Sequence, residues 1–339
     1  MSERTDIVEG AAGRDGVVRS SHSARDTLRA WYEQPSDPMR PLPASVYTCP
    51  DLWACELERI FSKEWIWCAH VSELESTGDF LTFKIIDTPL IVLRDEQQRL
   101  RAFANVCPHR GALLVEGKGC RSRFSCPYHA WTYDLNGSLE KAPYMDGRDL
   151  SAVHLHEYPV EVWCGLIFVT LDRTAAALAP RLEGLEERLA GLRIPQGTVI
   201  SRTENHMSCN WKLLVENFCE SYHVFRVHPE SIEPVNPSHT IEVGRAGPGF
   251  NDHTMALRRE GREESVLRLN CLYPSFTSTS NPNNMIMLSV QPTSPTTCRC
   301  FRLPFALRRG PASRGTSNVQ RSNEPRNWLT HTYTASGKP

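Results

Sequence analysis

The amino-acid sequence predicts an α+β protein that begins with a small antiparallel β domain. Hydrophobicity alternates with a period of two from Asp79 to about Asp172, which is typical of antiparallel strands. Segments with helical periodicity precede and follow this region. At 339 residues the chain is long enough for two domains with sizeable cores.

The elements are expected in a simple order along the chain. Residues 1–45 are polar and end in a Pro-dense stretch, which predicts an extended or partly disordered arm. A helix with one apolar face is expected from about Asp51 to Trp65. The strands of the β domain are expected at 79–86, 89–94, 99–106 and 160–172, with a hairpin over 131–139 that turns at Asn136 and Gly137.

A stripe of leucines follows the β domain. Leucine recurs at spacings of four and three from Leu178 to Leu192, which predicts a helix whose apolar face packs in a core. We therefore divide the chain into an arm, a β domain with its preceding helix, a second domain and a basic tail. Their boundaries are 1–45, 46–172, 173–300 and 301–339.

Composition excludes several classes of partner and compartment. A net charge of −1 provides no basic field for nucleic acid. The polar, acidic N-terminus is not typical of a secretory signal, and no apolar run approaches the length of a membrane span. Twelve cysteines are scattered without the spacing of a small disulfide scaffold. We expect a cytoplasmic protein with free thiols and no membrane or nucleic-acid partner.

Two short loops each contain one cysteine and one histidine. Cys107 and His109 lie in C-P-H-R-G, Cys126 and His129 lie in C-P-Y-H-A-W, and sixteen residues separate the two pairs. A Rieske [2Fe–2S] centre needs this ligand set, with two thiolates on one iron and two imidazoles on the other. Structural zinc is the alternative, although common zinc motifs pair like residues, as in C-x₂-C. The neutral imidazoles raise the reduction potential, so the predicted role is a one-electron relay.

Residues 210–229 form the second constellation of interest. If the first part is helical, Glu216, Glu220 and His223 share one face. His228 would point about 140° away from His223 in a straight helix, so a shared metal requires the helix to bend or end between them. Two imidazoles with a distant carboxylate form the facial triad of non-haem Fe(II) oxygenases. Ordinary helix-end histidines are the alternative, and Glu220 together with the Cys/His loops favours the metal site.

The two motifs, taken in this order, resemble the catalytic (α) subunit of Rieske non-haem iron ring-hydroxylating oxygenases. The resemblance rests on C-P-H-R-G-x₁₄-C-P-Y-H-A-W followed by N-W-K-x₃-E-N-F-x-E-S-Y-H-x₄-H, and it covers about residues 46–295. It implies a helix-grip catalytic domain beside the Rieske domain, with a [2Fe–2S] cluster and Fe(II) as cofactors. It also implies head-to-tail homotrimers, in which Glu220 bridges an iron histidine to a cluster histidine of the neighbouring subunit.

The resemblance implies hydroxylation of a small organic substrate by O₂, as a mono- or dioxygenase. Electrons would pass from an external NAD(P)H reductase or ferredoxin through the cluster to Fe(II) held by His223 and His228. The chain itself has no G-x-G-x-x-G dinucleotide motif, so a separate reductase is implied. Glu220 is more similar to the branch acting on quaternary amines such as carnitine or betaine than to naphthalene-type dioxygenases, which usually carry Asp. Aromatic acids remain an alternative.

The C-terminal part departs from the family pattern. The family takes a third iron ligand, Asp or Glu, from a helix roughly a hundred or more residues after the second histidine. No Asp follows Asp252, and Glu324 is the only acid after residue 300. Pro325 disfavours a helix there, so the third ligand is unknown. A frame-shifted or truncated C-terminus would explain the change, and a divergent natural end is the alternative. A Rieske electron carrier or a non-catalytic subunit that has lost this ligand is the alternative function.

Overall fold

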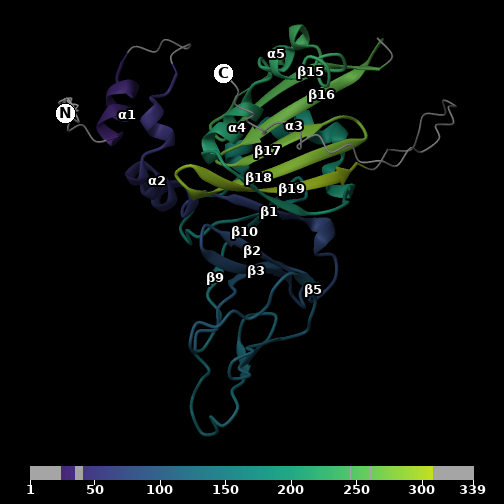
Figure 1. The fold of residues 1–339 in the computed structure, drawn as a ribbon. Helices are drawn as coiled ribbons and strands as arrows, with labels where there is room; N and C mark the ends of the chain where they lie inside the picture. The colour runs from purple at the N-terminus through teal and green to yellow at the C-terminus, as the bar shows by residue number, and fades with distance from the viewer. Residues whose placement is uncertain (1–23, 35–40, 245, 260–261, 308–339) are drawn as a thin grey trace, which may run out of the picture. The chain divides into compact units, whose positions relative to one another are not determined.

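The computed structural model describes residues 24–34, 41–244, 246–259 and 262–307 (Figure 1). Its N-terminal part is helical, with α1 at Ala24–Tyr32, η1 at Ala44–Tyr47, α2 at Pro50–Glu56 and the π-helix η2 at Leu57–Phe61. The expected extended arm is therefore wrong for the α1 segment. The helix expected to reach Trp65 ends at Phe61, because Trp65 is buried and donates its indole N–H to Ala176 O at 2.9 Å.

Three antiparallel sheets form the predicted β domain. A three-stranded sheet has the order β1–β11–β10, with bounds Ile66–His70, Leu166–Val169 and Val160–Trp163. A five-stranded sheet has the order β5–β2–β3–β4–β9, with bounds Lys118–Cys120, Asp79–Ile85, Thr88–Arg94, Leu100–Ala104 and Glu157–Tyr158. A small sheet has the order β6–β7–β8, with bounds Phe124–Ser125, Thr132–Tyr133 and Leu139–Lys141. The short 3₁₀ helix η3 is Val71–Glu73.

The β7–β8 hairpin differs from its expected two-residue turn. Asp134 N donates to Ser138 O at 3.0 Å, which leaves a three-residue loop ending at Gly137. Gly137 has the left-handed φ of 81°, and the Asp134 carboxylate accepts hydrogen bonds from Asn136 N and Ser138 N. The aspartate thus stabilises a longer turn than the Asn-Gly pair alone predicted.

The leucine stripe is confirmed as core, but it does not form one helix. It is divided into η4 at Ala179–Leu182, α3 at Leu185–Leu189 and η5 at Ala190–Leu192, with η6 at Ile194–Gln196 after it. Gly184, at φ 84°, separates η4 from α3 because the left-handed backbone cannot continue a right-handed helix. The side chains of Leu178, Leu182, Leu185 and Leu189 are all buried.

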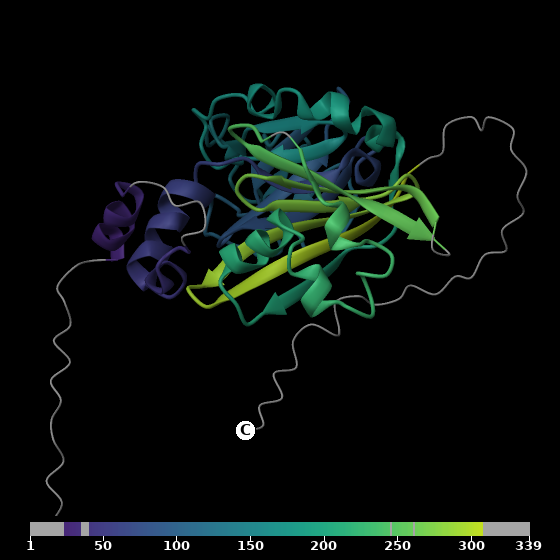
Figure 2. The same ribbon diagram turned by 90° about the horizontal axis from the view of Figure 1, so that it is seen from above.

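A larger antiparallel sheet makes up the second domain. Its order is β12–β19–β18–β17–β16–β15–β14, and β13 also pairs with β19. The bounds are Thr198–Val199 for β12, Thr203–Met207 for β13, Glu242–Val243 for β14, Phe250–Arg259 for β15, Arg262–Leu272 for β16, Phe276–Ser280 for β17, Asn284–Ser294 for β18 and Thr297–Ala306 for β19. The yellow-green strands β18 and β19 run side by side in both views (Figure 1, Figure 2). The expected boundary at residue 300 is therefore too early, because it falls inside β19.

Helix α4 (Trp211–Cys219) lies against strands β16–β19 of this sheet. The short helix α5 (Val224–Val227) and the 3₁₀ helix η7 (Ser238–Thr240) follow it. Trp211 packs edge-on against Phe61 of η2, with ring centroids 5.0 Å apart. This arrangement of helix on antiparallel sheet confirms the predicted α+β class.

Three buried clusters form the core. One joins side chains of β1–β4 to α4, β18 and β19, and another joins β1 and β11 to the leucine stripe and the large sheet. The third surrounds Cys107 and Cys126 with apolar side chains from β2–β4, β6 and β7. No helix among residues 24–34, 41–244, 246–259 and 262–307 is long and apolar enough to cross a membrane.

Candidate cluster and iron sites

The two Cys/His loops have the same backbone conformation. In each loop the residue four positions after the cysteine donates its N–H to the cysteine carbonyl, at 2.9 Å in the first loop and 3.0 Å in the second. That residue is left-handed in both, with φ 72° at Gly111 and 57° at Ala130. The N–H groups of Cys107 and Cys126 donate to the carbonyl five positions on, at 2.8 and 2.7 Å. A left-handed alanine costs about 1–2 kcal/mol, so the loop geometry is maintained against backbone strain.

The four side chains of these loops are arranged asymmetrically. Cys107 and Cys126 are buried, whereas His109 is partly buried and His129 is exposed. The two imidazole centroids lie 4.7 Å apart. Two imidazoles bound to one ion at about 2.1 Å place their centroids about 4.5–5.5 Å apart, so both rings can reach the same iron. A thiolate end in the core and an imidazole end at the surface suit a relay that exchanges electrons through the histidines.

The protonation and stacking of the histidines also fit a [2Fe–2S] cluster. His109 Nδ1 is buried and has no hydrogen-bond partner among the described residues, which marks it as the atom that would bind iron. The ring of His109 stacks on Trp131 with centroids 4.5 Å apart and planes 6° apart. Desolvation, with His109 and Arg110 nearby, lowers the pKa of His129 and favours the neutral form that binds metals.

Tyr133 contacts the buried thiolate end. Its hydroxyl lies 3.2 Å from Cys107 Sγ, and its side chain is fully buried. Burial, and then the neighbouring Cys107, raise the pKa of Tyr133, so the hydroxyl stays protonated and donates to sulfur. Sequence reasoning missed this residue, because nothing marks one strand tyrosine as the partner of a cysteine 26 positions away.

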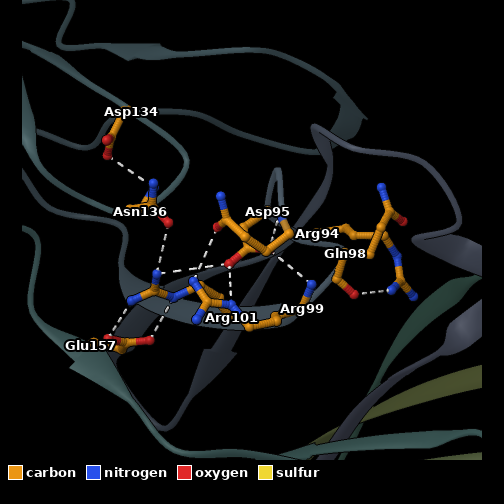
Figure 3. A network of polar contacts seen from close by, with 9 residues as sticks. Arg94, Asp95, Gln98, Arg99, Arg101, Asp134, Asn136 and Glu157 are labelled. Carbon is orange, nitrogen blue, oxygen red and sulfur yellow. Dashed lines mark hydrogen bonds and ion pairs between the residues drawn. The ribbon is translucent and has the colours of Figure 1, made fainter.

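A polar network connects the β7–β8 loop to the five-stranded sheet (Figure 3). Arg101 of β4 donates to Asn136 Oδ1 at 3.0 Å and to both oxygens of Glu157, at 2.7 and 2.6 Å. The buried Asp95 carboxylate lies 3.8 Å from Arg101. Burial acts to raise the pKa of Asp95, but hydrogen bonds from Arg99 and Gln97 outweigh it and hold that pKa below its usual value. The network holds the hairpin that follows the second ligand loop.

The second site begins at the end of α4. Asn210 caps the helix by accepting from Lys212 N at 2.9 Å, and the helix ends at Cys219. Glu220 is extended, with φ −138° and ψ 161°. The expectation that Glu216, Glu220 and His223 share one helical face is therefore wrong, because the helix stops before Glu220.

The two histidines of this segment are brought together by the shortness of α5. His223 is the residue before the helix and His228 the residue after it, and their ring centroids lie 5.5 Å apart. This separation is within the range for two imidazoles on one ion. A metal shared by the two histidines requires that no straight helix runs through both of them, and the structure meets this requirement. Burial, and then His223, lower the pKa of His228, which favours its neutral form.

Glu220 holds the orientation of His223. Its carboxylate accepts a short hydrogen bond from His223 Nδ1 and another from His223 N at 3.1 Å. With Nδ1 engaged by the carboxylate, Nε2 is left for a metal, the arrangement of a carboxylate–histidine–metal unit. The Glu220 side chain remains 46% exposed, so it can also meet a group from another molecule.

A buried histidine supports this segment from the sheet. His253 of β15 contacts Ser221 Oγ through Nε2 at 2.8 Å, directly beside Glu220. Burial lowers the pKa of His253, so the ring is neutral. Sequence reasoning missed this contact, since His253 lies in β15 and meets Ser221, in the segment after α4, only in the folded chain.

No three His, Cys, Asp or Glu side chains of the described residues converge on one metal-binding point. For the cluster this is expected, because each iron takes two protein ligands. At the second site it leaves His223 and His228 without a third protein ligand in that part of the chain. Glu324, the remaining candidate, lies outside the described residues.

Comparison with protein families matches two regions of the chain. Residues 64–159 match the Rieske [2Fe–2S] domain, and residues 196–324 match the catalytic domain of the ring hydroxylating alpha subunit. The chain belongs to the Rieske-type ring-hydroxylating alpha subunits. The cofactors of its two domains, a [2Fe–2S] cluster and mononuclear Fe(II), are those expected from the sequence. The second match continues to residue 324, so the expectation that the resemblance ends at about residue 295 is wrong.

Several of the similar proteins are named for quaternary amines. The chain is 37% identical over 194 residues to a carnitine monooxygenase oxygenase subunit of Acinetobacter baumannii, covering 55% of this chain and 52% of the relative. It is 32% identical over 263 residues to a glycine betaine monooxygenase oxygenase subunit of Chromohalobacter salexigens, covering 74% and 59%. A solved quaternary ammonium Rieske monooxygenase that oxidises carnitine has a TM-score of 0.73 at 28% identity, covering 78% and 75%. The chain thus spans between half and three fifths of the length of these two curated relatives.

Proposed function

We propose that the chain is the oxygenase component of a two-part enzyme that hydroxylates a small quaternary amine with O₂. The observation that carries the proposal is the convergence of His223 and His228 across α5, with Glu220 on His223 Nδ1. In this proposal Cys107, His109, Cys126 and His129 hold the cluster. The Rieske domain is 46–172, and the catalytic domain extends from 173 to at least Ala306, the end of β19.

The protein side chains have separate tasks in this scheme. When bound, the [2Fe–2S] cluster supplies single electrons and Fe(II) supplies open coordination positions for O₂. Tyr133 donates to Cys107 Sγ and stabilises negative charge at the buried end. Glu220 fixes the tautomer and direction of His223 and increases the basicity of its Nε2. Ser221 and His253 hold the backbone on which Glu220 and His223 lie.

The substrate class rests on two observations. The two curated relatives described above are named for carnitine and for glycine betaine. The residue that bonds His223 is Glu220, as in the quaternary-amine branch, rather than Asp. Hydroxylation beside a quaternary nitrogen followed by C–N cleavage would release a tertiary amine and an aldehyde. An aromatic acid is the alternative substrate.

Electron supply is proposed to require other protein molecules. Both sites reach the surface, where His129 and Glu220 are exposed. Exposed aromatic side chains lie beside them, with Tyr128 60% exposed next to His129 and Tyr222 75% exposed next to His223. Exposed aromatic side chains at functional sites are typical of protein interfaces. They support a head-to-tail homotrimer, with an NAD(P)H-dependent reductase or ferredoxin as donor.

One observation favours a second candidate function. Among the described residues the mononuclear site has two histidines and no third ligand. A chain that cannot hold Fe(II) would serve as a Rieske electron carrier or as a non-catalytic subunit of a trimer. Such a chain would contain the two irons of the cluster and no third iron.

The test is reconstitution of the full chain followed by iron and sulfide analysis and turnover. The proposal expects three irons and two sulfides per chain. It also expects formaldehyde or another aldehyde from carnitine or betaine, given a reductase and NAD(P)H. Two irons with a Rieske spectrum and no product would establish the carrier. Hydroxylated product from benzoate or anthranilate, with none from the amines, would overturn the substrate class alone.

A further inference from the structure

A group of thiols lies where α4 meets the large sheet. Cys68, Cys298 and Cys300 are buried in one core cluster, and Cys209 packs against it while partly exposed. Cys209 directly precedes Asn210, the residue that caps α4. Cys298 lies near the start of β19. None of these thiols has a part in the proposed cluster or iron sites.

Cys209 and Cys298 are the thiols of this group that lie in contact. Their Sγ atoms are 4.0 Å apart. Met207, the last residue of β13, is the register partner of Cys298, so the backbone of Cys209 continues from a strand already paired beside Cys298. A disulfide has a bond of about 2.05 Å, so the sulfurs must approach by about 2 Å, a shift within the reach of side-chain rotation and a small backbone movement.

The two thiols differ in the ways that a nucleophile and a resolving thiol differ. Cys209 is the partly exposed member, so a small oxidant can reach it, whereas Cys298 is fully buried. The Cys298 thiol donates a hydrogen bond to Cys209, which lowers the pKa of Cys209 despite its partial burial. The same contact and burial raise the pKa of Cys298. Reactive cysteines are typically accessible and stabilised as thiolates in this way.

We propose that Cys209 and Cys298 form a peroxide-oxidisable dithiol that closes to a reversible disulfide. The Cys209 thiolate attacks one oxygen of hydrogen peroxide, the O–O bond breaks, and Cys209 becomes a sulfenic acid while the other oxygen leaves as water. The Cys298 sulfur then attacks the Cys209 sulfur and releases the second oxygen as water. The two thiols together lose two electrons and two protons, and the peroxide is reduced to two waters.

The disulfide would act on the segment that leads to the second site. Asn210 Nδ2 already donates to Pro295 O at 2.7 Å, in the turn between β18 and β19, and to Tyr47 O at 3.0 Å, at the end of η1. The start of α4 is therefore held between this turn and the N-terminal helices. A bond from residue 209 to residue 298 would tie this joint covalently. Hydrogen peroxide is also the two-electron reduction product of O₂. The expectation that hydrogen peroxide forms close to this protein rests on the proposed oxygenase function. The proposed disulfide between Cys209 and Cys298 does not rest on that function.

The experiment is peptide mapping of the cluster-loaded full chain after limited hydrogen peroxide. Free thiols are alkylated with iodoacetamide, and the chain is cut with trypsin without reductant. Cleavage at Arg and Lys places Cys209 in peptide 203–212, Cys298 in 269–299 and Cys300 in 300–302. We expect a linked 203–212/269–299 pair, with fragmentation placing the link on Cys298, and its complete loss after dithiothreitol.

The outcomes separate the proposal from its rivals. Sulfinic acid on Cys209 with Cys298 still alkylated, or a link from 203–212 to 300–302, would overturn it. Cys209→Ser and Cys298→Ser should each abolish the link, and the matched control Cys300→Ser should retain it. The wild-type map alone decides the question if a variant fails to fold. Because the readout is peptide mass, a chain without oxygenase activity can still confirm the dithiol.

Discussion

At the residue scale, each site has a ligand side chain that is hydrogen-bonded to a neighbour which does not itself bind metal. Tyr133 lies 3.2 Å from Cys107 Sγ, and Glu220 bonds His223 Nδ1. Each partner adjusts the charge or direction of a ligand without binding metal itself, and such partners tune potential and affinity. These two contacts therefore give the sharpest tests of the assignments.

Tyr133→Phe should lower the reduction potential of the cluster. The hydroxyl hydrogen bond stabilises the more negative, reduced form, so its loss disfavours reduction. A hydrogen bond worth about 1.4 kcal/mol corresponds to about 60 mV for one electron. A redox titration followed by circular dichroism measures the shift. Tyr158→Phe, on β9, is the matched control, and an unchanged potential in Tyr133→Phe would exclude the contact in solution.

Glu220→Gln should preserve the cluster spectrum and slow electron delivery to the mononuclear iron by about 10–100-fold. The amide keeps the shape but loses the charge that orients the His223 N–H. Rapid-mixing single turnover measures the rate. Glu216→Gln is the control on the same segment, because the Glu216 carboxylate is bonded to Tyr47 instead of a histidine. Equal rates in wild type and Glu220→Gln would refute the positioning role.

At the scale of the element, α4 and α5 determine the second site by where they end. Asn210 caps the start of α4. The helix ends at Cys219, so the Glu220 side chain can turn back and accept hydrogen bonds from His223. The single turn of α5 places His223 and His228 on the same side. The geometry of the site therefore depends on helix boundaries rather than on helical periodicity.

Asn210→Ala should destabilise the fold by about 2–4 kcal/mol, the sum of a lost N-cap and of two partly buried carbonyls left without a donor. The Asn210 side chain accepts from Lys212 N and donates to Tyr47 O and Pro295 O. Urea unfolding of the loaded protein measures the change. Asn217→Ala replaces an exposed asparagine of the same helix and should cost much less. Equal losses in the two variants would show that the cap contributes little.

At the scale of the whole molecule, His70 connects segments far apart in the chain. Its Nε2 contacts Ile194 O at 3.1 Å, and its ring lies 4.6 Å from that of Phe305 in β19. Burial lowers the pKa of His70 to about 4, below its ordinary 6.5. The unfolded chain takes up a proton as the pH falls through about 6.5, and the folded chain does not.

Folding stability should therefore fall as the pH is lowered from about 6.5 to about 4, by at most about 3 kcal/mol from this residue. Below about pH 4, His70 is protonated in both the folded and the unfolded chain, so its effect on the free energy of unfolding no longer changes with pH. The measurement is the difference in urea midpoint between wild type and His70→Gln across this range, since other histidines cancel in the comparison. Parallel curves for the two proteins would contradict the assignment.

The proposed trimer is also a property of the whole molecule. Phe225→Glu places a charge on an exposed aromatic position beside the second site, and it should weaken association by about tenfold or more. Light scattering over a dilution series measures the mass. Val243→Glu, at an 86% exposed position on β14, is the control and should leave association unchanged. A wild-type chain that is monomeric while turning over would exclude the interface.

The sequence by itself determined the α+β class and the order of the Rieske and catalytic domains, and it predicted the cluster ligands and the two iron histidines. Motif spacing is local, and the mixed Cys/His loops and E-S-Y-H-x₄-H are each read within a few residues. Hydrophobic period located strands β2, β3, β4, β10 and β11 and the buried leucines for the same reason. It located no strand of the large sheet, and it missed the break at Gly184.

Only the tertiary structure decided which groups meet across the chain. Pairing of β13 with β19 brings Cys209 close to Cys298, and the fold of the segment after α4 onto β15 brings Ser221 to His253. Packing of the β domain brings Tyr133 to Cys107. The end of α4 before Glu220 also had no sequence signal, because Glu and Ser continue a helix as readily as they stop one. Contacts between distant residues depend on strand register and on burial, and the local pattern of side chains specifies neither of them.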